Sequence, residues 1–360
     1  MDDPRAHPPL VVIGGSAGAL RPLRRIIASL PPTLEAAIGV VIHVPDDSPS
    51  ALARVLATAG RLPASFAEDG QRVEAGTIAV APPGHHLLVN DGRLTLSRGA
   101  RENGTRPAID PLFRSAARSR GPGAVAVLLS GTLDDGMAGV AEVRRSGGVT
   151  LAQDPAEAEF PDMPRNAIAS GSVDEVLSST SLGPRIVELV AERRHLAPSH
   201  AGPGLAGDAD LAGDARTVDR GLAGRAEDLP GAGSPYSCPA CGGVLYDFGR
   251  EGGYVCRLGH RYSPDALRAG QEGIIEDALW TALRTLDEAA SLAERVRDRA
   301  TARGDRGMEL RFEARRAGAQ ARADRIRAVL RGETARGVDE LIDAVDQASS
   351  DDAGRGQPQG

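Results

Sequence analysis

Lysine is absent from this chain of 360 residues, so all 42 of its basic side chains are arginines, and 49 acidic ones outnumber them. The net charge of −7 argues against a nucleic acid as the main partner. Cysteine is scarce, and three residues, an odd number, argue against a disulfide framework. No apolar run approaches the roughly 20 residues of a transmembrane helix, and the N-terminus has no signal-peptide pattern. We therefore expect a cytoplasmic protein without a nucleic-acid partner and without membrane insertion.

Three continuous apolar runs lie in the first half of the chain, each before a polar side chain that acyl-transfer chemistry uses. They are residues 10–13 before Ser16, 40–42 before His43, and 124–129 before Asp134 and Asp135. Such runs, alternating with helical patterns, are typical of buried parallel strands. In an open parallel sheet the ligand crevice lies beyond the carboxyl ends of the strands. We predict a doubly wound α/β fold whose mostly parallel sheet, flanked by helices, brings a nucleophile, a base and a carboxylate to one edge.

Each of these residues also has a purely structural explanation. The glycine-rich segment 14–18 around Ser16 fits G-x-S-x-G, but it resembles a degenerate nucleotide loop as well. His43 can be an ordinary loop residue, and Asp134 with Asp135 can form a turn or cap a helix. The chain order Ser, His, Asp differs from that of α/β-hydrolases, in which the acid precedes the histidine.

Six motifs in the first half of the chain occur together in a known family. They are Ile13-Gly14-Gly15-Ser16, Ile42-His43-Val44-Pro45, Ala81-Pro82-Pro83-Gly84-His85-His86-Leu87, Arg106-Pro107-Ala108-Ile109-Asp110, Leu129-Ser130-Gly131-Thr132-Leu133-Asp134-Asp135-Gly136 and Met163-Pro164-Arg165-Asn166-Ala167-Ile168. From about Pro9 to Val190 the chain resembles the catalytic domain of the chemotaxis methylesterases, the CheB family, which remove methyl esters from glutamates of chemoreceptors. The resemblance implies a serine esterase, with glutamine deamidation as a companion reaction that the family permits.

The resemblance assigns roles that the chemistry supports. Ser16 would attack the ester carbonyl, His43 would take its proton, and Asp135, rather than its neighbour, would orient the imidazole. The backbone N–H groups of Ala17 and Gly18, at the start of the next helix, would receive the oxyanion.

Some positions depart from the family pattern. Thr132 and Leu133 stand where the family usually has methionine and glycine, and we expect leucine to disfavour the positive φ that glycine allows. Thr132 would still offer its backbone N–H to the oxyanion. His86 matches a histidine near the family's crevice or is a turn residue, and Arg106 either steers the substrate or caps a helix.

A further difference concerns regulation. Family members commonly begin with a receiver domain that gates the esterase, whereas the first catalytic strand is expected here within about ten residues of Met1. We therefore expect activity that is constitutive or controlled by something other than an in-chain receiver.

Four metal-binding side chains follow a linker rich in alanine, glycine, aspartate and proline: Cys238, Cys241, Cys256 and His260. Their C-x2-C and C-x3-H spacing, with glycine pairs for tight turns, is typical of a tetrahedral zinc site. Unpaired thiols are the alternative, but a domain of about thirty residues could hardly fold without a metal. Four protein ligands leave no open position, so we expect structural Zn²⁺ and no cofactor for catalysis. Related esterases without a receiver carry a similar segment.

The remaining C-terminal sequence is helical in pattern. Apolar residues recur at three, four or seven positions from Leu267 to Val296 and again from Leu310 to Leu330, with a glycine-rich break at 304–307. This predicts two antiparallel helices of about ten turns each. The expected domains are a CheB-type catalytic domain over residues 1–192, a flexible linker over 193–234, a Cys3His zinc module over 235–262, a helical hairpin over 263–345 and a disordered tail over 346–360.

The function that follows is hydrolysis of glutamate γ-methyl esters on a methyl-accepting chemotaxis-type receptor, with self-association through the C-terminal helices as a second contact. The competing hypothesis is a non-catalytic CheB-like relative that acts as a binding module in signalling. The departure at Thr132 and Leu133 favours that alternative, and the intact Ser16, His43 and Asp135 favour the enzyme.

Overall fold

The computed structural model describes residues 8–44, 50–196, 232–247 and 253–331. The expected tail over 346–360 and nearly all of the expected linker over 193–234 lie outside these residues. By compactness the chain divides into two units, residues 1–270 and 271–360. Each unit is described by itself.

The first unit begins with strands and helices in alternation. Its main strands are β1 (Leu10–Gly15), β2 (Ala37–Ile42), β3 (Ala64–Phe66), β4 (Ile78–Val80), β7 (Ala124–Leu128), β8 (Val149–Gln153) and β9 (Glu175–Leu177). Its helices are α1 (Leu20–Ser29), α2 (Leu52–Ala59), α3 (Ile109–Arg120), α4 (Met137–Arg145), α5 (Asp162–Ala169) and α6 (Ser179–Arg193). An antiparallel hairpin, β5 (His86–Asn90) and β6 (Arg93–Ser97), forms a separate small sheet.

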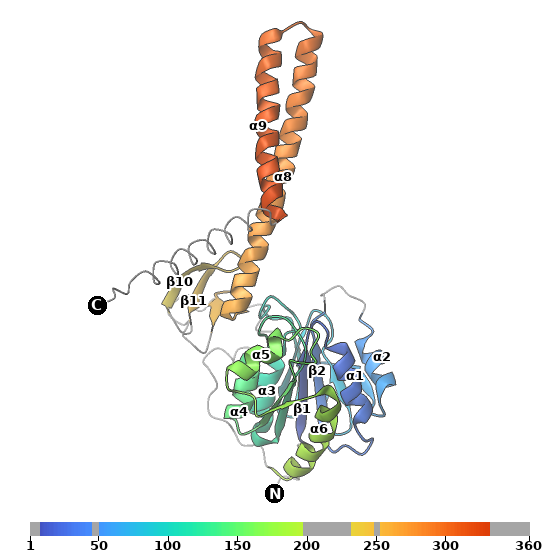
Figure 1. The fold of residues 1–360 in the computed structure, drawn as a ribbon. Helices are drawn as coiled ribbons and strands as arrows, with labels where there is room; N and C mark the ends of the chain where they lie inside the picture. Colours follow the sequence, from blue (N-terminus) through green and yellow to red (C-terminus); the bar gives the residue numbers. More distant parts are fainter. Residues whose placement is uncertain (1–7, 45–49, 197–231, 248–252, 332–360) are drawn as a thin grey trace, which may run out of the picture. The chain divides into compact units, whose positions relative to one another are not determined.

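The seven main strands form one sheet in the order β3-β4-β2-β1-β7-β8-β9, and every neighbouring pair is parallel. Helices α1, α2 and α6 cover one face, and α3, α4 and α5 cover the other (Figure 1). The parallel sheet flanked by helices that the sequence predicts is therefore confirmed. The chain runs outward from β1 to β2 and β4 and later returns to β7 on the other side of β1. This reversal of strand order is where such sheets open their ligand crevice.

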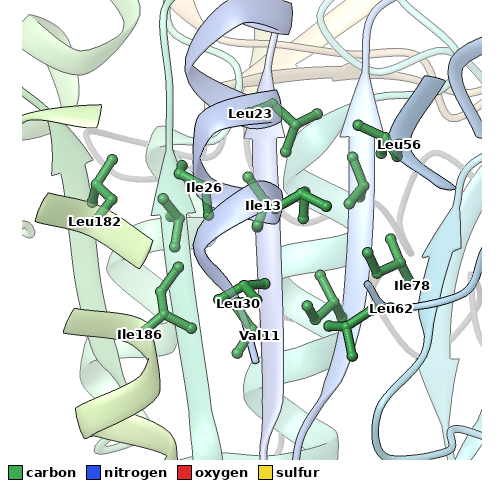
Figure 2. Packing of buried hydrophobic residues seen from close by; sticks show 14 of the residues in the cluster. Val11, Ile13, Leu23, Ile26, Leu30, Leu56, Leu62, Ile78, Leu182 and Ile186 are labelled. Atoms are coloured by element: carbon green, nitrogen blue, oxygen red, sulfur yellow. The ribbon is translucent and has the colours of Figure 1, made fainter. Parts of the chain in front are cut away.

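Alternate residues of β1 supply both halves of the core, because successive strand side chains point to opposite faces. Val11 and Ile13 pack with side chains of α1, α2 and α6, which Figure 2 shows from close by. Leu10 and Val12 pack with α3 and α4 on the opposite face. Each fully buried aliphatic side chain contributes about 1.5–3 kcal/mol. The strand that precedes Ser16 is thus fixed from both sides.

A second, antiparallel sheet follows in the first unit. It consists of β10 (Ala232–Ser237), β11 (Val244–Asp247), β12 (Tyr254–Cys256) and β13 (Arg261–Tyr262), in that order. Six buried residues form its small core: Cys238, Leu245, Cys256, Tyr262, Ala266 and Leu267. We call residues 232–263 the Cys3His module.

Two long helices end the described chain. Helix α8 (Pro264–Ala302) begins in the first unit, and its later part forms the second unit with α9 (Arg306–Leu330). Within that unit Arg297 donates to Glu313 at 2.9 Å and Arg327 to Asp287 at 2.7 Å, as in an antiparallel hairpin. The predicted helical hairpin is present up to Leu330, while residues 332–345 lie outside the described chain. None of the described helices has the length and apolarity to span a bilayer.

Gly139 allows α4 to pack closely on α3. A Cβ at this position would overlap the Cβ of Phe113 and lie 3.1 Å from Oδ1 of Asp110. Gly139→Ala is therefore expected to lower the free energy of unfolding by about 1–3 kcal/mol. Gly273→Ala is the matched control in α8, where a Cβ would meet nothing within 4 Å, and it should be neutral or stabilise by up to about 1 kcal/mol. Urea unfolding measures both, and equal effects would contradict the close packing.

Candidate active site

The carboxyl ends of three neighbouring strands each place one polar side chain at the same edge of the sheet. Ser16 follows β1, His43 follows β2, and Asp135 lies between β7 and α4. Because β1 pairs with both β2 and β7, these ends are adjacent. The Ser16 hydroxyl lies 3.1 Å from Nδ1 of His43, and Nε2 of His43 lies 2.7 Å from Oδ2 of Asp135. The structure thus joins the three side chains in one hydrogen-bonded line.

These two bonds fix the protonation of the His43 ring. An ionised Asp135 only accepts, so Nε2 carries the hydrogen and donates to it, while Nδ1 accepts from the Ser16 hydroxyl. The ring is used in the opposite sense to the serine-protease template, where Nε2 faces the serine. The chemistry is equivalent, because either nitrogen can take a proton while the other donates. The His43 side chain is 16% exposed and that of Asp135 3%, so the base is accessible and the carboxylate is buried.

The first turn of α3 holds the Asp135 carboxylate. The backbone N–H groups of Ile109 and Asp110 donate to it at 2.7 and 3.3 Å, and the Asn103 amide donates at 3.0 Å. Burial alone would raise the pKa of this carboxyl, but the hydrogen bond and charge of His43, followed by the other donors, lower the pKa below its ordinary value. The positive end of α3 acts in the same direction. Asp135 therefore stays ionised and orients the ring.

Asp134, the neighbouring acid, has different partners. Its Oδ1 accepts from the Ser263 hydroxyl at 2.6 Å. Burial raises the pKa of Asp134, and the nearby carboxylates of Asp265 and Asp135 add to the rise against the lowering effect of the Ser263 hydrogen bond. Of the two acids, Asp135 is the one bonded to His43, and Asp134 faces the Cys3His module.

The loop after Ser16 carries the two backbone donors expected at the oxyanion. No acceptor among the described residues binds the N–H of Ala17 or Gly18. Ser130 fixes the loop, because its carbonyl accepts from Ser16 N at 2.9 Å and its hydroxyl donates to the Ala17 carbonyl at 2.8 Å. Gly18 has φ of +73°, and a Cβ there would lie 2.7 Å from the Ser130 hydroxyl oxygen. The position therefore requires glycine.

The loop after β7 adopts a conformation that the sequence led us not to expect. Thr132 is exposed, and Leu133 has φ of +61°, in the left-handed region. The Asn166 amide donates to the Leu133 carbonyl at 2.9 Å and anchors the loop. Leucine thus takes the positive φ that its side chain disfavours. The fold sustains it at a cost of roughly 1–2 kcal/mol.

His86 and Arg106, the other two predicted site residues, lie around the start of α3. His86 is 1% exposed, and its Nε2 donates to the Ala100 carbonyl at 3.0 Å while its Nδ1 accepts from Ala108 N at 3.2 Å. Burial lowers the pKa of His86, which keeps the ring neutral in this position. Arg106 donates to the carbonyls of residues 98–99 at 3.0 and 2.9 Å. Both side chains thus contact the backbone that supports the turn before α3.

Asn103 contacts Asp135 but is absent from the residues that the sequence predicts for the site. A local signal was present, because an Asn-Gly dipeptide is typical of a tight turn. That signal predicts a turn and does not identify its distant neighbours. The contact between Asn103 and Asp135 therefore could not be predicted from the sequence and is seen only in the structure.

The four predicted metal ligands of the module come together, with all ligand atoms within 4.8 Å of one another. The Sγ atoms of Cys241 and Cys256 are 3.7 Å apart. Nδ1 of His260 lies 3.6 Å from Sγ of Cys238 and 3.4 Å from that of Cys256. A tetrahedral zinc ion with Zn–S of about 2.3 Å and Zn–N of about 2.0 Å keeps its ligands about 3.6–3.8 Å apart. The donor set and its spacing therefore fit zinc.

Comparison with known proteins relates the first half of the chain to one family. A family profile described as CheB methylesterase matches residues 11–186. Protein-glutamate methylesterase/protein-glutamine glutaminase 3 of Anaeromyxobacter dehalogenans (strain 2CP-C) is 42% identical over 187 residues, which are 51% of this chain and 54% of that protein. The chain spans about half the length of the three A. dehalogenans relatives that it matches.

Two further matches cover nearly all of the other chain. The crystal structure of the Thermotoga maritima CheB methylesterase catalytic domain aligns with a TM-score of 0.49 and 33% identity, over 51% of this chain and 98% of that one. A Leptospira interrogans serovar copenhageni relative, also described as a protein-glutamate methylesterase/protein-glutamine glutaminase, is 34% identical over 180 residues. These are 50% of this chain and 93% of the relative. At 34% identity over 93% of the Leptospira relative, the chain belongs to the CheB methylesterase family.

Proposed function

We propose that this protein is a serine esterase that hydrolyses glutamate γ-methyl esters on a methyl-accepting chemotaxis-type receptor. The observation that carries the proposal is the line from Ser16 through His43 to Asp135, with contacts of 3.1 and 2.7 Å. Membership of the family supports the substrate class, since the relatives are described as protein-glutamate methylesterases.

The proposed reaction has two steps, acylation of Ser16 with loss of methanol and hydrolysis of the acyl-enzyme, and the three side chains take part in both. The Ser16 Oγ attacks the ester carbonyl as its proton moves to Nδ1 of His43, and the Asp135 carboxylate stabilises the imidazolium. The N–H groups of Ala17 and Gly18 receive the oxyanion. Collapse of the tetrahedral intermediate expels methanol, which takes the proton from Nδ1. Water, activated by the same nitrogen, then releases the glutamate carboxylate.

Glutamine deamidation follows the same steps with ammonia as the leaving group. The proposal includes it because relatives carry the double description of methylesterase and glutaminase. The amide is the weaker electrophile, so we expect a slower acylation step than with the methyl ester.

A structural role is proposed for zinc. Cys238, Cys241, Cys256 and His260 would hold the ion and leave no coordination position for substrate. When bound, the metal would cross-link the two loops of a module whose core has six buried residues. No step of ester hydrolysis passes through this ion.

The proposed place of action is the cytoplasm, where the three thiols stay reduced. Helices α8 and α9 expose apolar side chains, among them Trp280, Leu292 and Leu310. We assign to these helices a contact with the helical part of the receptor. A second copy of this chain, bound through the same helices, is the other partner that the sequence suggests.

The competing function, a non-catalytic binding module, has weaker support from the loop after β7. It was favoured by the departure at Thr132 and Leu133, where leucine disfavours a positive φ, and Leu133 has φ of +61°.

Methanol release from a methylated receptor cytoplasmic fragment tests the proposed function. The purified full chain is expected to release methanol in proportion to the methyl groups lost, measured by isotope-labelled methyl transfer into a volatile fraction. Binding of the fragment without any methanol release would reject the esterase and favour the binding module.

A further inference from the structure

Residues 102–105 form a tight turn beside the triad. Glu102 N donates to Thr105 O at 3.2 Å and Thr105 N to Glu102 O at 2.9 Å. The two central residues, Asn103 and Gly104, have φ of +50° and +76°, as a type I′ turn requires. The turn is anchored to α3, because Arg114 donates to both carboxylate oxygens of Glu102 at 2.8 and 2.7 Å, with both side chains buried. Asn103 is therefore held rigidly at the turn tip.

The Asn103 side chain bridges two parts of the unit. Its Nδ2 donates to Oδ1 of Asp135 at 3.0 Å and to Oδ2 of Asp110 at 3.3 Å. Its Oδ1 accepts from the backbone N–H of Ser263 at 3.0 Å. Every polar atom of the amide thus has a partner, and the carbonyl and amino ends are assigned by the chemistry of those partners. The backbone N–H of Ser263 faces the amide oxygen, and the carboxylates of Asp135 and Asp110 face the amide NH2.

The amide also separates two buried carboxyl groups. Burial, followed by the charge of Asp135, raises the pKa of Asp110 well above its ordinary value. Asn103 offers one N–H to each group, which offsets part of their repulsion.

The Cys3His module docks against this turn through its last residues. Asn103 N donates to Arg261 O at 2.8 Å, and Arg261 N donates to Arg101 O at 3.3 Å. The Ser263 hydroxyl donates to Asp134 at 2.6 Å and accepts from Ala266 N at 3.0 Å, where it caps α8. The module therefore makes two hydrogen bonds to Asn103, which contacts the Asp135 carboxylate, and one to Asp134, which precedes Asp135 in the chain.

The metal-ligand loop lies directly next to this contact in the chain. His260 is followed by Arg261, whose carbonyl meets Asn103, and Ser263 comes two residues later. Cys256 N donates to His260 O at 3.0 Å, so the ligand loop and strand β13 are one tight hairpin. A change in the loop's conformation would displace Arg261 and Ser263 together.

We propose that Asn103 is a positioning residue for the Ser16–His43–Asp135 triad, and that the Cys3His module sets its amide through Ser263. The proposal rests on the proposed esterase function. The module is then a part of the catalytic unit, because its folding state changes the orientation of Asp135 and, through the hydrogen bond to Nε2, the orientation of the His43 ring.

The first test compares two glycine substitutions with the same backbone requirement. Asn103→Gly removes the bridge and keeps a positive φ without strain. Asp91→Gly is the matched control, because Asp91 has φ of +45° and precedes Gly92 in the β5–β6 turn. In the full chain, Asn103→Gly is expected to lower kcat by roughly tenfold to a hundredfold with KM little changed, as for loss of a hydrogen bond to a charged group. Asp91→Gly is expected to leave both constants unchanged.

The second test asks whether the module acts through Asn103. Ser263→Ala keeps the backbone N–H that donates to Asn103 but removes the hydroxyl that anchors Ser263 to Asp134, so the N–H is held less firmly and kcat is expected to fall several-fold. If the effect passes through the Asn103 amide, the Asn103→Gly, Ser263→Ala double variant should be no slower than Asn103→Gly alone. Fully additive losses would overturn the coupling.

A spectroscopic readout separates this proposal from the proposed function. The Nε2 proton of His43, bonded to Asp135, should give a low-field proton NMR resonance that shifts or broadens in Asn103→Gly and is unchanged in Asp91→Gly. A wild-type protein that releases no methanol would reject the esterase, yet this comparison would still test the bridge. An unshifted resonance together with unchanged turnover in Asn103→Gly would reject the positioning role.

Discussion

Ser16→Ala is expected to reduce kcat for methyl ester hydrolysis by about 10⁴–10⁶-fold, because the triad acts as one unit and no other group replaces the attacking oxygen. His43→Ala should lose nearly as much, and combining the two should add little. Methanol release measures the rate, and circular dichroism melting shows that the variants remain folded. Residual activity above about one percent in Ser16→Ala would contradict its assignment as the nucleophile.

The two adjacent acids supply a matched pair within this prediction. Asp135→Asn removes the charge that stabilises the His43 imidazolium and should cost about 10⁴-fold in kcat. Asp134→Asn keeps a carbonyl oxygen for the Ser263 hydroxyl and should cost less than about tenfold. If Asp134→Asn were the inactive variant, the carboxylate would have been assigned to the wrong residue.

Removal of the metal is expected to unfold the Cys3His module, because six buried residues give too small a core to offset the entropy of ordering it. All four tyrosines of the chain lie in this module, and the rings of Tyr236 and Tyr254 meet edge to face at 5.4 Å. The near-ultraviolet circular dichroism of tyrosine therefore reports on the module alone. A strong chelator should abolish this signal, and zinc should restore it.

Two controls accompany the metal experiment. Elemental analysis is expected to find roughly one equivalent of zinc in the wild type. Cys241→Ser should lose it, whereas Ser237→Ala, outside the ligand set, should retain it. A tyrosine signal that persists in metal-free protein would mean that the module folds without the ion and that the proposed structural role is incorrect.

The strand ends of the fold could be predicted because they depend on local pattern. Continuous apolar runs indicate buried parallel strands, and the crevice rule then places Ser16 and His43 at one edge. The register of β1 with β2 and β7, which makes these ends adjacent, agrees with that reasoning. The C-terminal hairpin followed in the same way from apolar spacing and a glycine-rich break.

The support around the triad could not be predicted, because it depends on contacts between distant segments. The donors to Asp135 come from Ile109, Asp110 and Asn103, and no local pattern relates those positions to residue 135. Leu133 shows the opposite difficulty. Its intrinsic preference argued against a positive φ, but the fold holds Leu133 at φ of +61°, and its carbonyl accepts from Asn166, thirty-three residues away.

The turn that carries Asn103 also has a slow chemistry of its own. In an Asn-Gly dipeptide the glycine nitrogen can attack the asparagine side-chain carbonyl with loss of ammonia, and water then opens the ring to an aspartate, since glycine offers no side chain to hinder the attack. At this position the product would replace an N–H donor by a third carboxylate next to Asp110 and Asp135. Deamidation of Asn103 would then accumulate during storage, and an old preparation would lose turnover while Ser16 and His43 remain chemically intact.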